Sequence, residues 1–215
     1  MDRLTGIHAV REALEAGRAF DRIVIAKGRQ DSRVEEIPPK SDVGIMNPFS
    51  AADVAVLLRD RGWISSSEIS AEQSSWCERA AFLLGPQAAD REALAELLRL
   101  VFEYDAARAM ASVEAHAVMT RYAARDVIRL LARLLLDGEP CTPERFKEIV
   151  TTLKEKLDLR GREVLHPLRL ALVGRAGEGQ LDRVILLVDA AASAGFAANV
   201  KTVRERVIEF CSALD

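Results

Sequence analysis

The sequence has few aromatic residues and no long apolar run, and both absences restrict the class of protein. Aromatic residues make up only 5% of the 215 positions. Ala, Leu, Arg and Glu dominate instead, which favours helices, because β-rich domains depend on Val, Ile, Thr and aromatic residues. No apolar run approaches the roughly 20 residues that span a bilayer. Met1–Thr5 holds no apolar stretch of the kind found in signal peptides, so we expect a cytoplasmic protein without a membrane partner.

Residues that bind metals or form disulfides are few and far apart. The three cysteines form no CxxC pair, and their odd number argues against a disulfide framework. The three histidines lie more than 45 residues apart, with no Cys or acid at ligand spacing. We therefore expect no metal and no cofactor. The residues in question are Cys77, Cys141, Cys211, His8, His116 and His166.

Sequence motifs of common enzymes are also absent. There is no Walker loop, no GxGxxG and no HExxH segment. The glycine-rich segment Gly174–Gly179 follows an expected helix rather than a strand, so we interpret it as a connector. We expect no catalytic residue, and the chain is not expected to be an enzyme by itself.

Positive charge is concentrated near the C-terminal end of a chain whose net charge is −3. Between Lys154 and Arg175, six Lys or Arg residues stand against three acids, a local balance of +3. Local concentration of charge matters more for nucleic-acid binding than the net value. Charge alone nevertheless favours an ordinary solvated turn between helices, so the interpretation depends on motifs. The six cations are Lys154, Lys156, Arg160, Arg162, Arg169 and Arg175.

The first 37 residues differ from the rest and predict a short α/β fragment. Thr5 has the side chain of an N-cap for a helix over Gly6–Ala16, and Phe20–Ala26 is typical of a strand. The pattern G-I-H-A-V-x-E-A-L, followed by D-R-I-x-x-A-K-G, resembles the beginning of the substrate-binding domain of ribose 2′-O-methyltransferases acting on ribosomal or transfer RNA. The resemblance ends near Ile37, and a linker is expected over residues 38–46.

Beyond Pro48 the sequence predicts helices almost throughout. Capping boxes at Ser50 and Ser70 begin the first two, and Thr142 begins another with a proline in the first helical position. Further helices are expected over Asp90–Glu103, one or two over Asp105–Leu136, then over Glu163–Val173, Gln180–Ala190 and from Asn199 to about Ala213. We expect a mainly α fold with two helical subdomains, 47–140 and 141–215, that divide near Glu139–Thr142.

The most informative segment is Leu165–Arg175, which has the sequence LHPLRLALVGR. Apolar residues follow helical spacing, a proline stands where a helix would begin, and Arg169 is the one cation within the apolar run. The segment resembles the H/Q-P-L-R-x-A-L-T-G motif in the C-terminal anticodon-binding part of bacterial glutamyl-tRNA synthetases, with Val173 in place of the usual threonine. The resemblance covers about residues 47–214 and is strongest from Pro143.

This resemblance implies a fold of the class I synthetase anticodon-binding type and a set of RNA-binding residues. Arg169 is expected to contact an anticodon base, because a guanidinium makes two parallel hydrogen bonds and stacks on unpaired bases. The alternative is a structural Arg169 that pairs with Glu163 or Asp158. Gly174, Arg175 and Leu181 are expected to shape the adjoining surface, and Lys154, Lys156, Arg160 and Arg162 to hold phosphates.

A further site residue follows from the same resemblance. Many members that discriminate between tRNAs have an arginine after the proline that ends the helix equivalent to Ser70–Leu84. That arginine screens the third anticodon base and favours glutamate over glutamine tRNA. The corresponding residue here is Gln87, after Gly85-Pro86. Glutamine at this position is similar to members that accept both tRNAs.

Three functions remain as hypotheses. The leading one is a tRNA-binding anticodon-recognition module without a catalytic domain, because the HIGH-type and KMSKS-type signatures of a synthetase are missing. Its partners are tRNA of the glutamate type, with the glutamine type left open, and a separate catalytic subunit. The second is an accessory RNA-binding fragment of a ribosomal or transfer RNA ribose methyltransferase. The third is a helical protein-interaction module. The sequence leaves the oligomeric state open, as well as a gene-fusion origin without selected function.

Overall fold

The structure is a computed structural model that describes residues 48–65, 68–121, 123–177 and 181–214. Contacts between residues divide the chain into two units, Met1–Ile45 and Met46–Asp215. All described residues belong to the second unit. The α/β fragment predicted for residues 1–37 and the linker predicted for residues 38–46 lie outside the described residues.

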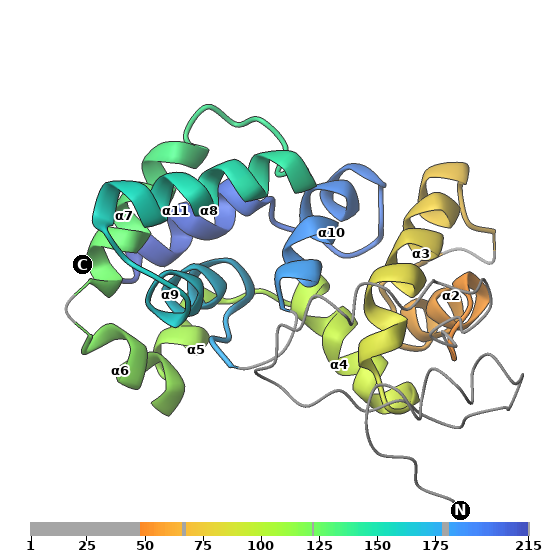
Figure 1. Cartoon of the computed structure of the whole chain (residues 1–215). Coiled ribbons are helices and arrows are strands. Elements are labelled where there is room, and N and C mark those ends of the chain that lie inside the picture. The colour runs from red at the N-terminus through yellow and green to blue at the C-terminus, as the bar shows by residue number, and fades with distance from the viewer. Residues whose placement is uncertain (1–47, 66–67, 122, 178–180, 215) are drawn as a thin grey trace, which may run out of the picture. The chain divides into compact units, whose positions relative to one another are not determined.

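The described residues form α-helices joined by short connections and contain no strand, so the predicted mainly α fold is confirmed. Figure 1 shows α7, α8, α9 and α11 gathered on one side, α2 and α3 on the other, and α4 and α10 between them. The elements are α2 (Ala51–Asp60), α3 (Ala71–Leu84), the short 3₁₀-helix η2 (Gly85–Gln87), α4 (Arg91–Phe102), α5 (Ala106–Met110), α6 (Val113–Met119), α7 (Ala124–Leu135), α8 (Pro143–Leu157), α9 (Arg162–Val173), α10 (Asp182–Ser193) and α11 (Val203–Ser212). None of these helices is long and apolar enough to cross a membrane.

Local capping explains where several helices begin, as the sequence predicts. Ser50 accepts from the backbone N–H of Asp53, whose carboxylate accepts from the N–H of Ser50 at 2.8 Å. Ser70 and Gln73 form the same reciprocal pair. Thr142 accepts from the N–H of Arg145, with Pro143 in the first position. Each cap satisfies backbone donors that the first helical turn leaves unpaired.

Two predicted helix boundaries are wrong. The segment 105–136 contains three helices rather than one or two, because Asp105 and Ser112 each cap a short helix before α7 begins. The last helix begins at Val203 and not near Asn199, because Thr202 forms a capping box with Glu205. In both cases an N-cap residue, Ser112 or Thr202, begins a helix at a position that the sequence analysis does not predict.

The position of the proline in α9 also differs from the expectation. The helix begins at Arg162, after Gly161 with a φ of 54°, so Pro167 is the sixth residue of the helix and is buried within it. Pro167 has no N–H to donate to the carbonyl four residues earlier. Arg169 is therefore two turns into α9, and the expectation that the proline stands where the helix begins is wrong.

An aromatic cluster joins segments that are far apart in the sequence. Trp63 and Phe102 stack with centroids 4.7 Å apart, and Phe196 meets Phe102 and Trp76 edge-on at 5.1 Å and 5.2 Å. The indole N–H of Trp76 donates to the carbonyl of Leu187 at 3.0 Å. The cluster thus links α3 and the end of α4 to α10 and the segment that follows it.

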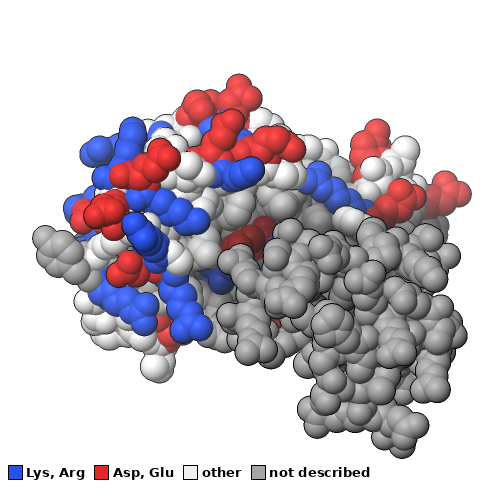
Figure 2. Space-filling view, in the orientation of Figure 1, with Lys and Arg blue, Asp and Glu red and all other residues white. Residues whose placement is uncertain are grey.

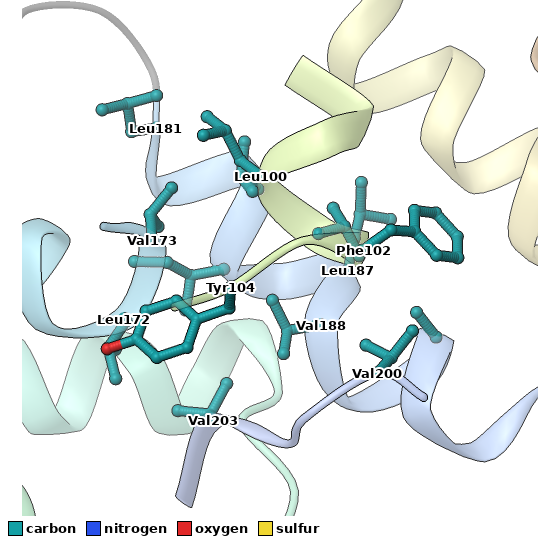
Figure 3. Packing of buried hydrophobic residues seen from close by; sticks show 14 of the residues in the cluster. Leu100, Phe102, Tyr104, Leu172, Val173, Leu181, Leu187, Val188, Val200 and Val203 are labelled. Carbon is teal, nitrogen blue, oxygen red and sulfur yellow. The ribbon is translucent and has the colours of Figure 1, made fainter. Parts of the chain in front are cut away.

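Packing crosses the predicted boundary near Glu139–Thr142. Helix α7 packs against α8, α9 and α11, and α10 packs against α3 and α4 as well as α9. Figure 3 shows Tyr104, from the segment after α4, beside Leu172 of α9 and Val188 of α10. The division into two subdomains stays a prediction.

Candidate nucleic-acid interface

Four exposed cations lie at the junction between α8 and α9, where a few residues connect the two helices. Helix α8 ends where Asp158 adopts a left-handed conformation with a φ of 50°, and the N–H of Leu159 donates to the carbonyl of Lys154 at 3.2 Å. Gly161, also with positive φ, starts α9. The exposed cations on this junction, which we call the junction cations, are Lys154, Lys156, Arg160 and Arg162.

The turn before α7 also lies near the α8–α9 junction. Burial lowers the pKa of His166, and the charges of Arg121, Arg169 and Arg162 lower it further, whereas Glu114 opposes them. The exposed Arg121 and the junction cation Arg162 therefore lie close enough to act on one half-buried imidazole, which is neutral at pH 7. Figure 2 shows Lys and Arg side chains gathered on the part of the molecule where α6 to α9 lie, with acids between them.

Arg169 lies beneath this surface and is bound by a carboxylate. Its Nε donates to Oδ1 of Asp182 at 2.7 Å, and its Nη2 donates to Oδ2 at 3.0 Å. Nη1 donates to the carbonyl of Gly177 at 3.4 Å. Arg169 is 9% exposed. This fork-to-fork pair fixes the plane of the guanidinium, and the partner is Asp182 rather than Glu163 or Asp158.

The connector after α9 is shaped by Gly174 and carries Arg175 outward. Gly174 ends the helix with a φ of 78°, a conformation that side chains rarely adopt. Arg175 is exposed, and its charge is one of the smaller contributions that lower the pKa of Glu96 on α4, after the hydrogen bond from Arg99. Leu181 is buried at the start of α10. The start of this connector therefore lies close to α4.

A cleft of about 190 Å³ adjoins this connector. Its lining includes Gly174 and Arg175 from the connector and three cation- or hydroxyl-bearing residues, Arg99, Arg108 and Ser112, from α4 to α6. Glu103 and Asp105 also line it, so its charge is mixed. The cleft places Arg99 and Arg108 beside the predicted site residues Gly174 and Arg175.

Gln87 is far from the other predicted residues in the sequence, on the short helix η2. It ends η2, is half-buried, and donates from Nε2 to the carbonyl of Leu83 at 2.8 Å. Arg183, in the first turn of α10, donates to the same carbonyl at 3.2 Å. The structure thus places Gln87 near the start of α10. Arg183, which shares this carbonyl, follows directly after Leu181 and Asp182 in the sequence.

The predicted site residues therefore form three groups. The first group lies where α9 ends and α10 begins and consists of Arg169, Gly174, Arg175 and Leu181. The second group is the junction cations, at the other end of α9, which is roughly 18 Å long at 1.5 Å per residue. The third is Gln87, near the start of α10. Sequence reasoning missed Arg121, Asp182 and Arg183. The last two follow directly after Leu181, which was a usable signal, whereas nothing local marks Arg121.

Below the site, a buried arginine holds the ends of two helices. Arg206 is fully buried and donates to the carbonyls of Leu100 and Leu172 at 2.9 Å and 3.0 Å, and also to Val101. Tyr104 donates from its hydroxyl to the carbonyl of Ala171 at 2.6 Å. These bonds satisfy carbonyls at the C-terminal ends of α4 and α9, and so fix the turn from which Gly174 and Arg175 emerge.

Comparisons with known proteins match both parts of the chain. A family model described as an anticodon binding domain matches residues 49–193, and one described as RNA 2′-O ribose methyltransferase substrate binding matches residues 3–41. The chain is 25% identical over 122 residues to a glutamate–tRNA ligase of Bacillus velezensis, a match that covers 57% of this chain and 25% of the relative. The chain thus spans about a quarter of the length of that relative. No solved structure matches. Both resemblances predicted from the sequence are confirmed.

Proposed function

Because this chain belongs to the anticodon binding domain family, we propose that it is a tRNA-binding module that recognises an anticodon loop. The observation that carries the proposal is the exposure of the junction cations and Arg175 at the two ends of α9, within the segment that matches the family. Exposed Lys and Arg side chains bind phosphates and position an RNA without selecting its sequence. The connector between α9 and α10 would then contact the bases.

The tRNA that we propose is of the glutamate type, with the glutamine type accepted as well. The curated relative is a glutamate–tRNA ligase, and Gln87 stands where a discriminating arginine would screen the third anticodon base. In the structure Gln87 donates to the carbonyl of Leu83. Its amide oxygen can still accept a hydrogen bond from a base, because a side-chain amide carries both donor and acceptor groups.

Arg169 has a defined geometry for base recognition in this proposal. Three of its hydrogen bonds go to Asp182 and Gly177, and a guanidinium carries five N–H donors. Asp182 holds the guanidinium plane, so that the remaining donors meet a base in one orientation. Asp182 is then a positioning residue for Arg169, and its loss would weaken the preference between anticodons more than the affinity for RNA in general.

The sequence of these 215 residues holds no ATP-binding signature of a synthetase. We propose that the chain does not activate glutamate by itself and that a separate catalytic subunit supplies this step. Glutamate-dependent exchange of pyrophosphate into ATP by the purified chain, above a no-protein control, would contradict this part of the proposal.

The experiment that tests tRNA recognition is retention of total tRNA by the immobilised chain, followed by sequencing. We expect enrichment of tRNAs of the glutamate and glutamine types. Uniform retention of all tRNAs would show phosphate binding without anticodon recognition. No retention of any RNA would favour the helical protein-interaction module.

A second candidate function rests on the match of residues 3–41 to the substrate-binding domain of RNA ribose methyltransferases. In that case the N-terminal unit provides the RNA affinity. Deletion of residues 1–45 distinguishes the two candidates, because the chain divides after Ile45. The anticodon proposal expects selective tRNA retention to survive the deletion. The methyltransferase-related proposal expects it to be lost.

A further inference from the structure

Helix α7 carries three arginines on one exposed face, which we call the arginine face: Arg125, Arg129 and Arg133. Residues four apart in an α-helix point in nearly the same direction, and eight residues rise by about 12 Å. The three side chains therefore form a row along almost the whole helix. None of them belongs to the residues that the sequence resemblance singled out.

The opposite face of α7 explains why the helix is held in place. Ala124, Val127, Ile128, Leu131 and Leu135 are all at most 2% exposed. This face packs against α8, α9 and α11. Burial of these side chains stabilises α7 through tertiary packing. The exposed arginines on the outer face are therefore not needed for the helix to form.

The arginine face is not neutralised by its surroundings. Within the part of the chain that the structure describes, none of the three arginines has an ion pair or a side-chain hydrogen bond. Asp126 is the single acid within α7, which leaves that helix with a charge of +2, three arginines less one aspartate. Asp137, four residues after Arg133, is bound instead by Arg145, whose hydrogen bond lowers the pKa of that carboxyl.

This arrangement works against helix stability. Like charges four residues apart repel each other along a helix surface, and two such pairs occur here, Arg125–Arg129 and Arg129–Arg133. A row of like charges without an ion-pair partner among the described residues is suited to a ligand of opposite charge. The structure thus points to an extended anion rather than to a single small one.

The arginine face continues the junction cations. At the far end of α7, Arg145 near the start of α8 donates to the carbonyl of Leu134. The start of α8 therefore lies beside the end of α7, and the two helices pack against each other. Arg121 stands just before α7 and acts on the same imidazole as Arg162. The two basic sets meet at Arg121.

We propose that the arginine face binds the phosphate backbone of a double-stranded RNA stem. In the context of the proposed function, on which this assignment of a stem rests, the stem is the one that supports the anticodon loop. Guanidinium groups bind phosphates through paired hydrogen bonds, and RNA duplexes are recognised mostly by shape and backbone contacts. Helix α7 carries no aromatic side chain, whereas single strands are bound by aromatic residues on which bases stack.

The test compares three proteins, each as the full chain. The first is the unaltered chain. The second carries Arg125→Gln, Arg129→Gln and Arg133→Gln, and glutamine is as good a helix former as arginine. The third is a control with the same change in charge, Arg59→Gln, Arg79→Gln and Arg91→Gln, which alters exposed arginines on α2, α3 and α4. The probes are a short blunt-ended RNA duplex without a loop and an anticodon stem-loop, each titrated at several salt concentrations.

We expect the arginine-face variant to bind the duplex more weakly, with a smaller salt dependence. The slope of log K against log salt should fall in magnitude by about 0.9 for each arginine that contacts a phosphate. The control should keep the slope of the unaltered chain. The melting temperature of the arginine-face variant should stay the same or rise, because repulsion along α7 is removed. A variant with lysine at the three positions should recover most of the slope.

An unchanged slope in the arginine-face variant, an equal loss in the control, or no duplex binding by the unaltered chain would each overturn the inference. The stem-loop separates this result from the proposed function. Loss of duplex binding in the variant supports the arginine face even when the unaltered chain shows no preference among anticodons. A preserved anticodon preference together with an unchanged duplex slope rejects the arginine face alone.

Discussion

The guanidinium of Arg206 lies over the ring of Tyr104, 4.9 Å from its centroid. Burial lowers the pKa of Arg206 to about 10, so the side chain stays charged at neutral pH. It has no carboxylate ion pair among the described residues and is surrounded by backbone carbonyls instead. Burial of a charged group costs free energy. The contact with the Tyr104 ring and the hydrogen bonds to carbonyls offset that cost for Arg206.

We predict that Arg206→Ala destabilises the protein by about 3 kcal/mol or more. The change leaves buried carbonyls of α4 and α9 without donors and opens a cavity. Chemical denaturation measures the effect. Arg204→Ala is the matched control, because Arg204 is an exposed neighbour on α11, and changes at such positions stay within about 0.5 kcal/mol. Similar values for the two variants would show that the carbonyl contacts of Arg206 contribute little.

The prediction for Arg169 separates base contact from phosphate contact. Arg169→Ala should weaken binding of the preferred tRNA by about 1–3 kcal/mol and flatten the preference between anticodons. Lys154→Ala or Arg162→Ala should weaken all RNAs alike and reduce the salt dependence. Binding titrations with anticodon stem-loops that differ at single bases measure both effects.

The ion pair of Arg169 makes a folding control necessary. Breaking a largely buried pair leaves an unpaired charge and costs up to about 3–5 kcal/mol. Asp182→Asn removes the carboxylate and keeps Arg169, so it reports on positioning. If Arg169→Ala remains folded and binds every tRNA as before, the anticodon assignment of this residue is wrong.

The last helix offers a test of its observed boundary. Thr202→Ala should cost about 1 kcal/mol, the usual contribution of an N-cap, whereas Asn199→Ala should change the stability by less than about 0.5 kcal/mol. Urea unfolding of the two variants gives the comparison. A larger loss for Asn199→Ala would place the start of the helix where the sequence predicted it.

The same cap predicts a dependence on pH. Hydrogen bonds from the backbone and side chain of Thr202 lower the pKa of Glu205 below its usual 4.5. A carboxyl with a depressed pKa contributes stability that is present above the unfolded value and is lost as the pH falls through the folded value. The difference in stability between the unaltered protein and Glu205→Ala should therefore shrink below about pH 4.5, because this variant removes both hydrogen bonds from residue 202 to the carboxylate. An unchanged difference down to pH 2 would exclude Glu205 from the cap.

Gln87 gives a prediction about specificity. Gln87→Arg should reduce binding of glutamine-type tRNA relative to glutamate-type tRNA, because the resemblance implies that an arginine here screens the third anticodon base. The ratio of the two dissociation constants is the measurement, with Gln87→Ala as the control for loss of the amide. Equal losses for both tRNAs in Gln87→Arg would show that this position does not select.

The features that could be predicted from the sequence are those set by short-range contacts. The caps at Ser50, Ser70 and Thr142 depend on a side chain and a backbone N–H three residues away, so the pattern of residues determines them. The helix start at Thr202 belongs to the same class, because its capping box with Glu205 is also a pattern of residues three positions apart, although the sequence analysis predicts Asn199 as the cap.

The contacts that define the candidate site depend on tertiary packing. The pair of Arg169 with Asp182 crosses the α9–α10 connector, and Arg206 meets Leu100 across 106 positions. Neither partner follows from spacing along one helix. The interior position of Pro167 was missed for a related reason, since a proline is usually a sign of a helix start and only the packing of the whole of α9 accommodates it within the helix.

The aromatic cluster has a practical consequence for experiments on this protein. The two tryptophans of the chain, Trp63 and Trp76, both belong to it and are 5% and 3% exposed. Their fluorescence emission therefore reports on whether α3, α4 and α10 remain packed, and a shift to longer wavelength marks unfolding. Neither indole lies among the residues proposed to bind RNA, so intrinsic fluorescence monitors stability, while binding requires a label on the RNA.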